Sequence, residues 1–193
     1  MMTQTNVVVA FYKPYGVLST FTDPEGRPTL KNYVSLPNIY PVGRLDFDSE
    51  GLLLLTNDGG LIHRLTHPQH HVPKTYLVQV EGVISPEAVA ALQRGVVIKG
   101  RKTRRCQVVV IPEPSLPPRE KPVTPHGPTS WLRIVLFEGM KRQIRHMTAA
   151  VGYPTLRIVR IAIGPINLEG LLPGQWRFLS PVEIERLQEA SRR

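Results

Sequence analysis

Asp46 is the residue of this sequence best placed to do chemistry, because it lies in a charged segment directly before a strongly apolar run. The four leucines at 52–55 and the turn residues after them predict a buried strand. Such a strand would hold the charged residues on a loop, where catalytic groups are common. A carboxylate there can act as nucleophile or base. With Asp48 or Glu50 it could instead form the acid–base pair of a glycoside hydrolase, and an ordinary solvated turn would look the same.

Three further segments place cations next to aromatic residues or to one another. They are Lys13-Pro14-Tyr15-Gly16, Lys74-Thr75-Tyr76, and residues 138–147, which read EGMKRQIRHM. The first segment is a turn signal after an apolar strand, and the second begins an alternating, β-rich stretch. Taken alone, a plain turn and ordinary strand packing account for both of them.

The third segment leads into a helix that we predict over residues 141–151, closed by Gly152. Its apolar residues recur at helical spacing. Arg142 and Arg145 lie three residues apart, so we expect them to share the opposite face of the helix. A solvated cationic face would show the same pattern, and a face that meets phosphates or a carboxylate is the functional interpretation. The apolar residues are Ile144, Met147 and Val151.

In this order the four segments resemble the motifs of the A-type pseudouridine synthases of the small ribosomal subunit. Residues 43–46 match the GRLD signature of that family, and a serine, a glycine and an apolar strand follow. The segments at 13–16 and 74–76 match its Lys-Pro-x-Gly and Lys-x-Tyr motifs. The EGMKRQIRHM segment matches EGxxRQIRRM, with His146 in place of the second arginine. The resemblance covers roughly residues 8 to 180.

The resemblance implies an enzyme that isomerises a specific uridine of ribosomal RNA, expected to be 23S rRNA. Asp46 would be the catalytic residue; whether it attacks C1′, attacks the uracil ring or acts as a base stays open. Arg44 would help to move the uridine out of the base stack, and Tyr76 would stack on the uracil. Arg145, or alternatively Arg142, would keep Asp46 ionised. The expected substrate-binding residues are Arg44, Lys74, Tyr76, Arg142 and Arg145.

No cofactor is expected, because the reaction breaks the glycosidic bond and rejoins the uracil through carbon without net oxidation. The sequence also lacks GxxxxGK[ST] and GxGxxG runs. Four clustered histidines have spacings that could hold a metal, but no cysteine pair or HExxH motif accompanies them. We therefore expect no metal, and interpret this segment as a loop facing solvent or RNA. The histidines are His63, His67, His70 and His71.

The composition indicates a globular protein with a polyanionic partner. Residues 1–100 hold 8 Lys and Arg against 8 Asp and Glu, whereas residues 101–193 hold 16 against 7, which accounts for the whole net charge of +9. Ribosomal RNA fits that surplus, but a non-catalytic RNA-binding protein of ribosome assembly would fit it equally well. No apolar stretch approaches the ~20 residues of a membrane span. The single Cys106 suits a reducing compartment. We expect a cytoplasmic monomer without membrane contact.

The expected fold is α+β, because strands outnumber helices and turns join most of them. The resemblance adds a mostly antiparallel central sheet with flanking helices and a central cleft, in a single domain of two lobes that share the sheet. It also implies the short form of the family, without an N-terminal S4 RNA-binding domain. Residues 112–128, with seven prolines, are predicted to be a loop. Strands are predicted at 7–12, 52–56, 75–80, 103–111, 131–137 and 157–163, and helices around 61–65, after Ser85, at 141–151 and after Ser180.

Overall fold

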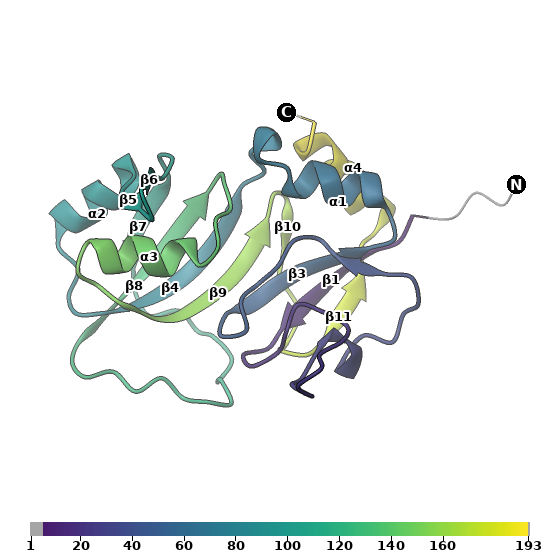
Figure 1. Ribbon diagram of the computed structural model, residues 1–193, viewed down its shortest axis with the longest axis horizontal. Helices are drawn as coiled ribbons and strands as arrows, with labels where there is room; N and C mark the ends of the chain where they lie inside the picture. Colours follow the sequence, from purple (N-terminus) through teal and green to yellow (C-terminus); the bar gives the residue numbers. More distant parts are fainter. Residues whose placement is uncertain (1–5, 193) are drawn as a thin grey trace, which may run out of the picture. The chain divides into compact units, whose positions relative to one another are not determined.

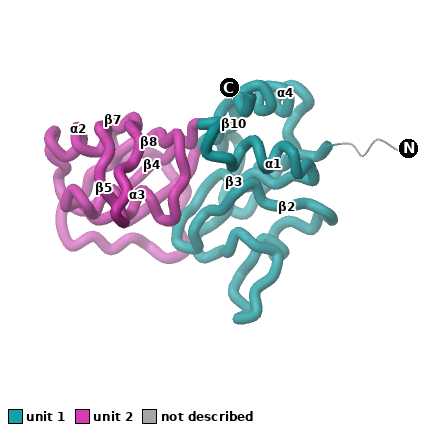
Figure 2. The backbone as a smooth tube through the Cα atoms, turned by 45° about the horizontal axis from the view of Figure 1, so that its top comes forward, with its two compact units in different colours: residues 1–72, 162–193 teal, residues 73–161 magenta. Residues whose placement is uncertain are grey.

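The computed structural model describes residues 6–192 and divides the chain into two compact units (Figure 2). Unit 1 comprises residues 1–72 and 162–193, and unit 2 comprises residues 73–161. The helices among residues 6–192 are all too short or too polar to cross a lipid bilayer.

The elements of unit 1 are β1 (Val8–Lys13), a 3-10 turn (Leu30–Asn32), β2 (Tyr40–Pro41), β3 (Glu50–Thr56), α1 (Gly59–Thr66), a second 3-10 turn (Pro68–His70), β10 (Ile166–Asn167), β11 (Trp176–Phe178) and α4 (Pro181–Ala190). Unit 2 holds β4 (Lys74–Glu81), α2 (Pro86–Arg94), β5 (Val97–Ile98), β6 (Arg101–Lys102), β7 (Gln107–Ile111), β8 (Thr129–Leu136) and α3 (Gln143–Ala150). The division between the units falls within β9 (Thr155–Ile163), after Ile161.

Unit 1 is built on β1, which pairs antiparallel with β3 and with β11 (Figure 1). Both faces of β1 and β3 are covered, which explains the unbroken run of leucines in β3. On one face Leu52 and Leu54 pack with α1 and α4, and on the other Leu53 and Leu55 pack with the segment that contains Leu45. Each of the four leucines in the run is fully buried, worth roughly 1.5–3 kcal/mol apiece. The predicted core strand is therefore confirmed.

Unit 2 has the strand order β9-β4-β8-β7, with β4–β8 and β7–β8 antiparallel. Helices α2 and α3 pack on one face of this sheet (Figure 1), where Leu92 and Met147 join the core cluster of Val78 and Ile134. The outer edge of β7 is partly occupied, because the amide Nε2 of Gln93 in α2 donates to the carbonyl of Val108 at 2.8 Å.

Helix starts follow the local signals. The Asp58 side chain accepts from the N–H of Leu61 at the start of α1, and Ser85 caps α2. Ser180 and Glu183 form the predicted capping box of α4.

Two predicted element boundaries are wrong. The strand expected at 103–111 begins only at Gln107, because residues 103–106 hydrogen-bond elsewhere: Thr103 N–H donates to Val96, and Cys106 N–H to Gln93. The helix expected at 141–151 runs over Gln143–Ala150. It starts late because Arg142 has the left-handed backbone angles φ 55° and ψ 33°.

The predicted proline-rich loop, residues 112–128, contains no helix or strand. It is nevertheless held at defined points. Arg157 donates from Nη2 to the carbonyl of Pro117 at 2.8 Å. Oε1 of Glu81 accepts from the backbone N–H groups of His126 and Gly127, both at 2.9 Å. Prolines and these three bonds together fix the course of the loop within unit 2.

Candidate functional site

The loop that carries Asp46 is fixed from the residue directly before it. Leu45 is buried in the core of unit 1 and is gripped by Ser19. The Ser19 hydroxyl donates to the Leu45 carbonyl at 2.7 Å and accepts from the Leu45 N–H at 3.0 Å. Ser19 itself is buried. One neutral side chain thus satisfies both backbone groups of the residue before Asp46, and this pair of bonds is called the Ser19 clamp below.

On its far side the loop is held by the Lys13-Pro14-Tyr15-Gly16 turn. The N–H of Gly16 donates to the carbonyl of Phe47 at 2.9 Å, and Gly16 has a φ of +76°, which glycine adopts at no steric cost. The ammonium of Lys13 is fully buried and closes the turn by donating to the carbonyls of Pro14 and Val17, at 2.9 and 2.7 Å. The first motif therefore supports the second within unit 1.

This arrangement leaves the functional groups of the loop accessible. Asp46 is half-buried, Arg44 is exposed, and the ring of Phe47 is 40% exposed. The N–H of Ser49 donates to the carbonyl of Asp46 at 3.0 Å, which makes the loop a tight turn into β3. A carboxylate on a fixed backbone with an open side can meet a bound group without first reorganising the loop.

Lys74 and Tyr76 lie at the start of β4 in unit 2. Burial, and secondarily the nearby guanidinium of Arg160, lower the pKa of the Lys74 ammonium to about 8. Tyr76 is only 9% exposed and belongs to the hydrophobic core of unit 2. Most of its ring is therefore used in packing, and a stacking partner could reach only the remaining exposed part.

The loop before α3 is closed by two buried polar side chains, Glu138 and Gln143. Oε1 of Glu138 accepts from the Nε2 of Gln143 and from the N–H of Arg104, both at 2.8 Å. Oε1 of Gln143 accepts from the N–H of Met140 at 3.1 Å. These three bonds are called the Glu138 clamp below. They hold the turn in which Arg142 takes its left-handed conformation, which costs about 1–2 kcal/mol outside glycine.

The two arginines of this segment do not share a helix face as predicted. Arg142 precedes the first helical residue, whereas Arg145 lies within α3, and both side chains are half-buried. The apolar stripe was predicted correctly, since Ile144 and Met147 are buried. His146, the departure from the family motif, has its Nε2 enclosed without a hydrogen-bond partner among the residues that the structure describes.

The histidine segment stacks rings instead of converging on a point. His63 and His67 have ring centroids 4.9 Å apart, and His67 and His70 meet edge to face at 6.0 Å. Within residues 6–192, no group of three or more His, Cys, Asp and Glu side chains is arranged to hold a metal ion.

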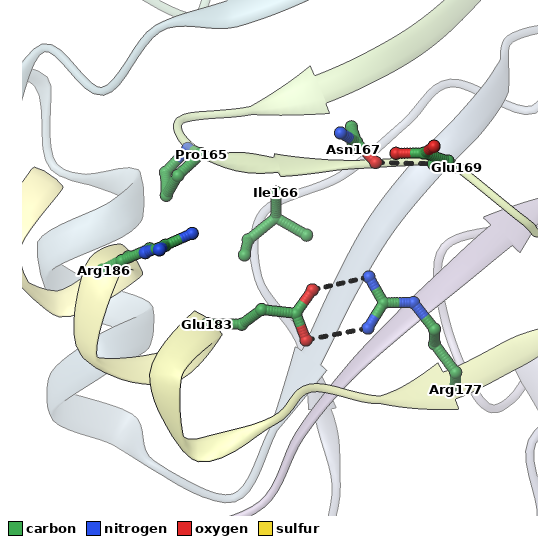
Figure 3. A pocket seen from close by; sticks show the side chains of 7 residues that line it. All are labelled: Pro165, Ile166, Asn167, Glu169, Arg177, Glu183 and Arg186. Carbon is green, nitrogen blue, oxygen red and sulfur yellow. Dashed lines mark hydrogen bonds and ion pairs between the residues drawn. The ribbon is translucent and has the colours of Figure 1, made fainter.

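A hollow of about 350 Å³ in the C-terminal part of unit 1 contains none of the predicted site residues (Figure 3). Its most prominent feature is an ion pair in which Arg177 donates two hydrogen bonds to Glu183, at 2.9 and 2.7 Å. Arg177 is the main reason that the pKa of Glu183 falls to about 2. Because these charges satisfy each other and Glu183 also caps α4, the hollow is a structural feature. Its lining is Pro165, Ile166, Asn167, Glu169, Arg177, Glu183 and Arg186.

Several residues with a structural part in the candidate site were missed from the sequence. Ser19 lies 26 positions before the residue that it holds, so no local pattern points to it. Lys13 and Glu138 belong to recognised motifs, but their burial could not be read from those motifs. Phe47, an exposed aromatic next to Asp46, gave the one available signal.

A sequence profile described as RNA pseudouridylate synthase matches residues 7–150. The chain belongs to the RNA pseudouridylate synthase family. The family was thus predicted correctly, and the enzyme is an RNA pseudouridine synthase, an isomerase. This excludes both a glycoside hydrolase and a non-catalytic assembly protein.

Two curated relatives of this pseudouridine synthase are named ribosomal large subunit pseudouridine synthase E. The protein from Xanthomonas axonopodis pv. citri (strain 306) is 52% identical over 86% of this chain and 90% of its own length. That from Vibrio vulnificus (strain CMCP6) is 47% identical over 90% of this chain and 75% of its own length. A solved structure named pseudouridylate synthase superposes with a TM-score of 0.81 at 27% identity, covering 97% of this chain and 76% of its own. The predicted α+β fold is confirmed.

Proposed function

We propose that this enzyme isomerises one uridine of large-subunit ribosomal RNA, 23S rRNA, to pseudouridine. The observation that carries the proposal is the likeness to the Xanthomonas protein, which is named a ribosomal large subunit pseudouridine synthase and matches over 90% of its length. The reaction breaks the C1′–N1 bond and forms a C1′–C5 bond. The proton lost from C5 is balanced by one gained at N1, so no oxidant, cofactor or metal is required.

We propose that Asp46 is the catalytic residue. Support comes from its position in the GRLD signature and from the Ser19 clamp, which fixes the backbone directly before it while its own side chain keeps an open side. Arg44 is exposed on the same loop and would help to extrude the uridine. The proposed contacts from unit 2 are Lys74, Tyr76, Arg142 and Arg145, with Arg145 keeping the aspartate ionised.

We also propose that the enzyme works as a cytoplasmic monomer, in which both units make up a single catalytic domain. The cytoplasm is where a bacterial-type ribosomal RNA substrate is made, and the thiol of Cys106 is buried and reduced. Sedimentation of the purified protein with and without RNA tests the monomer.

The function is tested by mapping pseudouridine in unmodified RNA of the large and of the small ribosomal particle after treatment with purified enzyme. We expect one modified position, in the large-subunit RNA, and none with the Asp46→Asn variant. Modification confined to small-subunit RNA would overturn the substrate, and equal modification by Asp46→Asn would overturn the catalytic residue.

A further inference from the structure

The two units differ sharply in charge. Unit 2 contains 15 Lys and Arg against 5 Asp and Glu, a net +10, whereas unit 1 contains 9 against 10, a net −1. Within unit 2 the cations are concentrated: residues 88–112 hold six Lys and Arg and no acid. Five of those six fall within residues 99–105, which read KGRKTRR.

These five cations are displayed on a small hairpin. Strands β5 and β6 pair antiparallel and are joined by Lys99 and Gly100, whose φ angles are +49° and +75°. Two consecutive positive φ values are typical of a tight two-residue hairpin turn. The cationic side chains of this segment are all exposed, while Ile98, Thr103 and Cys106 beside them are buried.

The hairpin is held firmly against the rest of unit 2. The Thr103 hydroxyl accepts from the N–H of Val96 at 3.0 Å, and the Arg104 N–H is a donor in the Glu138 clamp. A side chain at Gly95 would place its Cβ 2.2 Å from the Thr103 carbonyl, so only glycine permits this close return of the chain. Strand β5 contacts α3, the helix that carries Arg145. The cations are therefore displayed on a fixed surface.

Most of this charge is not neutralised by acidic side chains. Arg101 lies 3.7 Å from Oε2 of Glu138, the one acid near the hairpin. Lys99, Lys102 and Arg105 form no ion pair among the residues that the structure describes. Clustered cations repel one another, and a polyanion relieves that repulsion while releasing its own counterions.

We propose that residues 99–105, the basic hairpin, form a docking surface for the phosphate backbone of the RNA substrate. The proposal rests on the proposed function and adds a contact outside the residues assigned to the target uridine. Phosphate contacts position a nucleic acid without specifying its sequence. The hairpin should therefore contribute equally to the binding of substrate RNA and of unrelated RNA.

The test compares two triple variants that lose the same charge. The hairpin variant carries Lys99→Asn, Lys102→Gln and Arg105→Gln, with asparagine at position 99 because it tolerates positive φ. The control variant carries Lys31→Gln, Arg186→Gln and Arg192→Gln, three exposed cations of unit 1. Both variants have a net charge of +6 in place of +9, so any difference between them reports position and not total charge.

Dissociation constants are measured between 50 and 200 mM salt with substrate RNA and with an unrelated RNA of equal length. Each lost phosphate contact should flatten the slope of log K against log salt by about 0.7 on single strands. Three contacts correspond to a salt effect smaller by about 20-fold over this range. We expect this for the hairpin variant with both RNAs, and little change for the control. Turnover at saturating RNA should stay within about twofold of wild type, because the hairpin positions RNA and the target uridine is bound elsewhere.

Equal losses in both variants would overturn the proposal, because net charge alone would then explain binding. An unchanged hairpin variant, or one that loses turnover at saturating RNA, would overturn it too, as would binding of an acidic protein with greater salt dependence than RNA. Failure of the wild-type enzyme to modify ribosomal RNA would count against the proposed function only. All six replaced side chains are exposed, so equal unfolding temperatures serve as the folding control.

Discussion

The Asp46 loop of unit 1 and the Arg142 loop of unit 2 are both held by buried polar side chains, but of opposite chemical kinds. The Ser19 clamp is a neutral hydroxyl that donates one bond and accepts another. The Glu138 clamp is a carboxylate that only accepts. The units have net charges of −1 and +10. A buried carboxylate is tolerable where cations and N–H donors surround it, whereas a second carboxylate behind Asp46 would oppose the ionisation of the catalytic group.

The difference separates two tasks. Unit 1 presents one reactive carboxylate from a loop whose support carries no charge. Unit 2 supplies cations, and its internal anion organises the segment from which two of them project. Loss of the first support should damage chemistry, and loss of the second should damage the folded structure of unit 2.

The largest effect should come from Asp46→Asn. Asparagine keeps the shape of the side chain but can act as neither nucleophile nor base, so turnover should fall by at least about 10²–10⁴-fold. RNA affinity should stay within a few-fold, because the cations of unit 2 are unchanged. Asp48→Asn on the same loop is the matched control and should remain active. Measurable turnover by pure Asp46→Asn enzyme would remove the basis for assigning chemistry to unit 1.

Arg145→Ala should reduce turnover at saturating RNA by about 10-fold or more, with a smaller change in affinity. The reason is that a cation lost near a carboxylate makes its ionised form less favourable. Arg133, an exposed cation of β8 in the same unit, provides the control through Arg133→Ala. If Arg145→Ala and Arg133→Ala both altered only the dissociation constant, unit 2 would be a binding surface without a part in turnover.

Glu138→Ala should destabilise the protein more than any change in the Ser19 clamp. It leaves two buried donors, the Arg104 N–H and the Gln143 amide, without their acceptor, at roughly 1–3 kcal/mol for each. Glu138→Gln retains an acceptor oxygen and should recover much of that loss. Urea unfolding measures both variants. Equal stability of wild type and Glu138→Ala would show that the clamp does not hold the loop.

Ser19→Ala should cost roughly 1–3 kcal/mol, because it strands the N–H and carbonyl of Leu45 in the core. At temperatures where the variant is folded, we expect kcat to fall while RNA affinity is retained. Ser19→Thr keeps the hydroxyl and is the rescue variant. A loss of affinity without a loss of kcat would blur the division of tasks between the two loops.

The smallest effect concerns Lys74, whose ammonium is disfavoured by burial and by Arg160. Between pH 8 and its ordinary pKa of 10.5 the folded state binds fewer protons than the unfolded state, so the contribution of Lys74 to stability should rise with pH in this window. NMR of ¹³C-labelled lysine should show one resonance titrating near pH 8. Arg160→Met should raise that midpoint, and an unchanged midpoint would exclude Arg160 as a cause.

The sequence was sufficient where the determining interactions are local. Asp58, Ser85 and Ser180 cap helices from positions next to the first turn, and the four leucines of β3 mark their own burial. Local rules failed where distant groups decide the backbone. The left-handed turn at Arg142 depends on buried polar partners that include Arg104, 38 positions earlier in the chain. The GRLD signature identified the loop of Asp46, but only the folded chain shows how Ser19 holds it.

Gln93 has a consequence for self-association. Strand β7 is an edge of the sheet in unit 2 and exposes Val109 and Val110, which makes it a potential template for a strand from another copy. The Gln93 amide already occupies the Val108 carbonyl. Directly after the strand, Pro112 lacks the N–H that a longer ladder would need. A helix side chain and a proline thus guard this edge against the growth of intermolecular β-structure when the enzyme is concentrated.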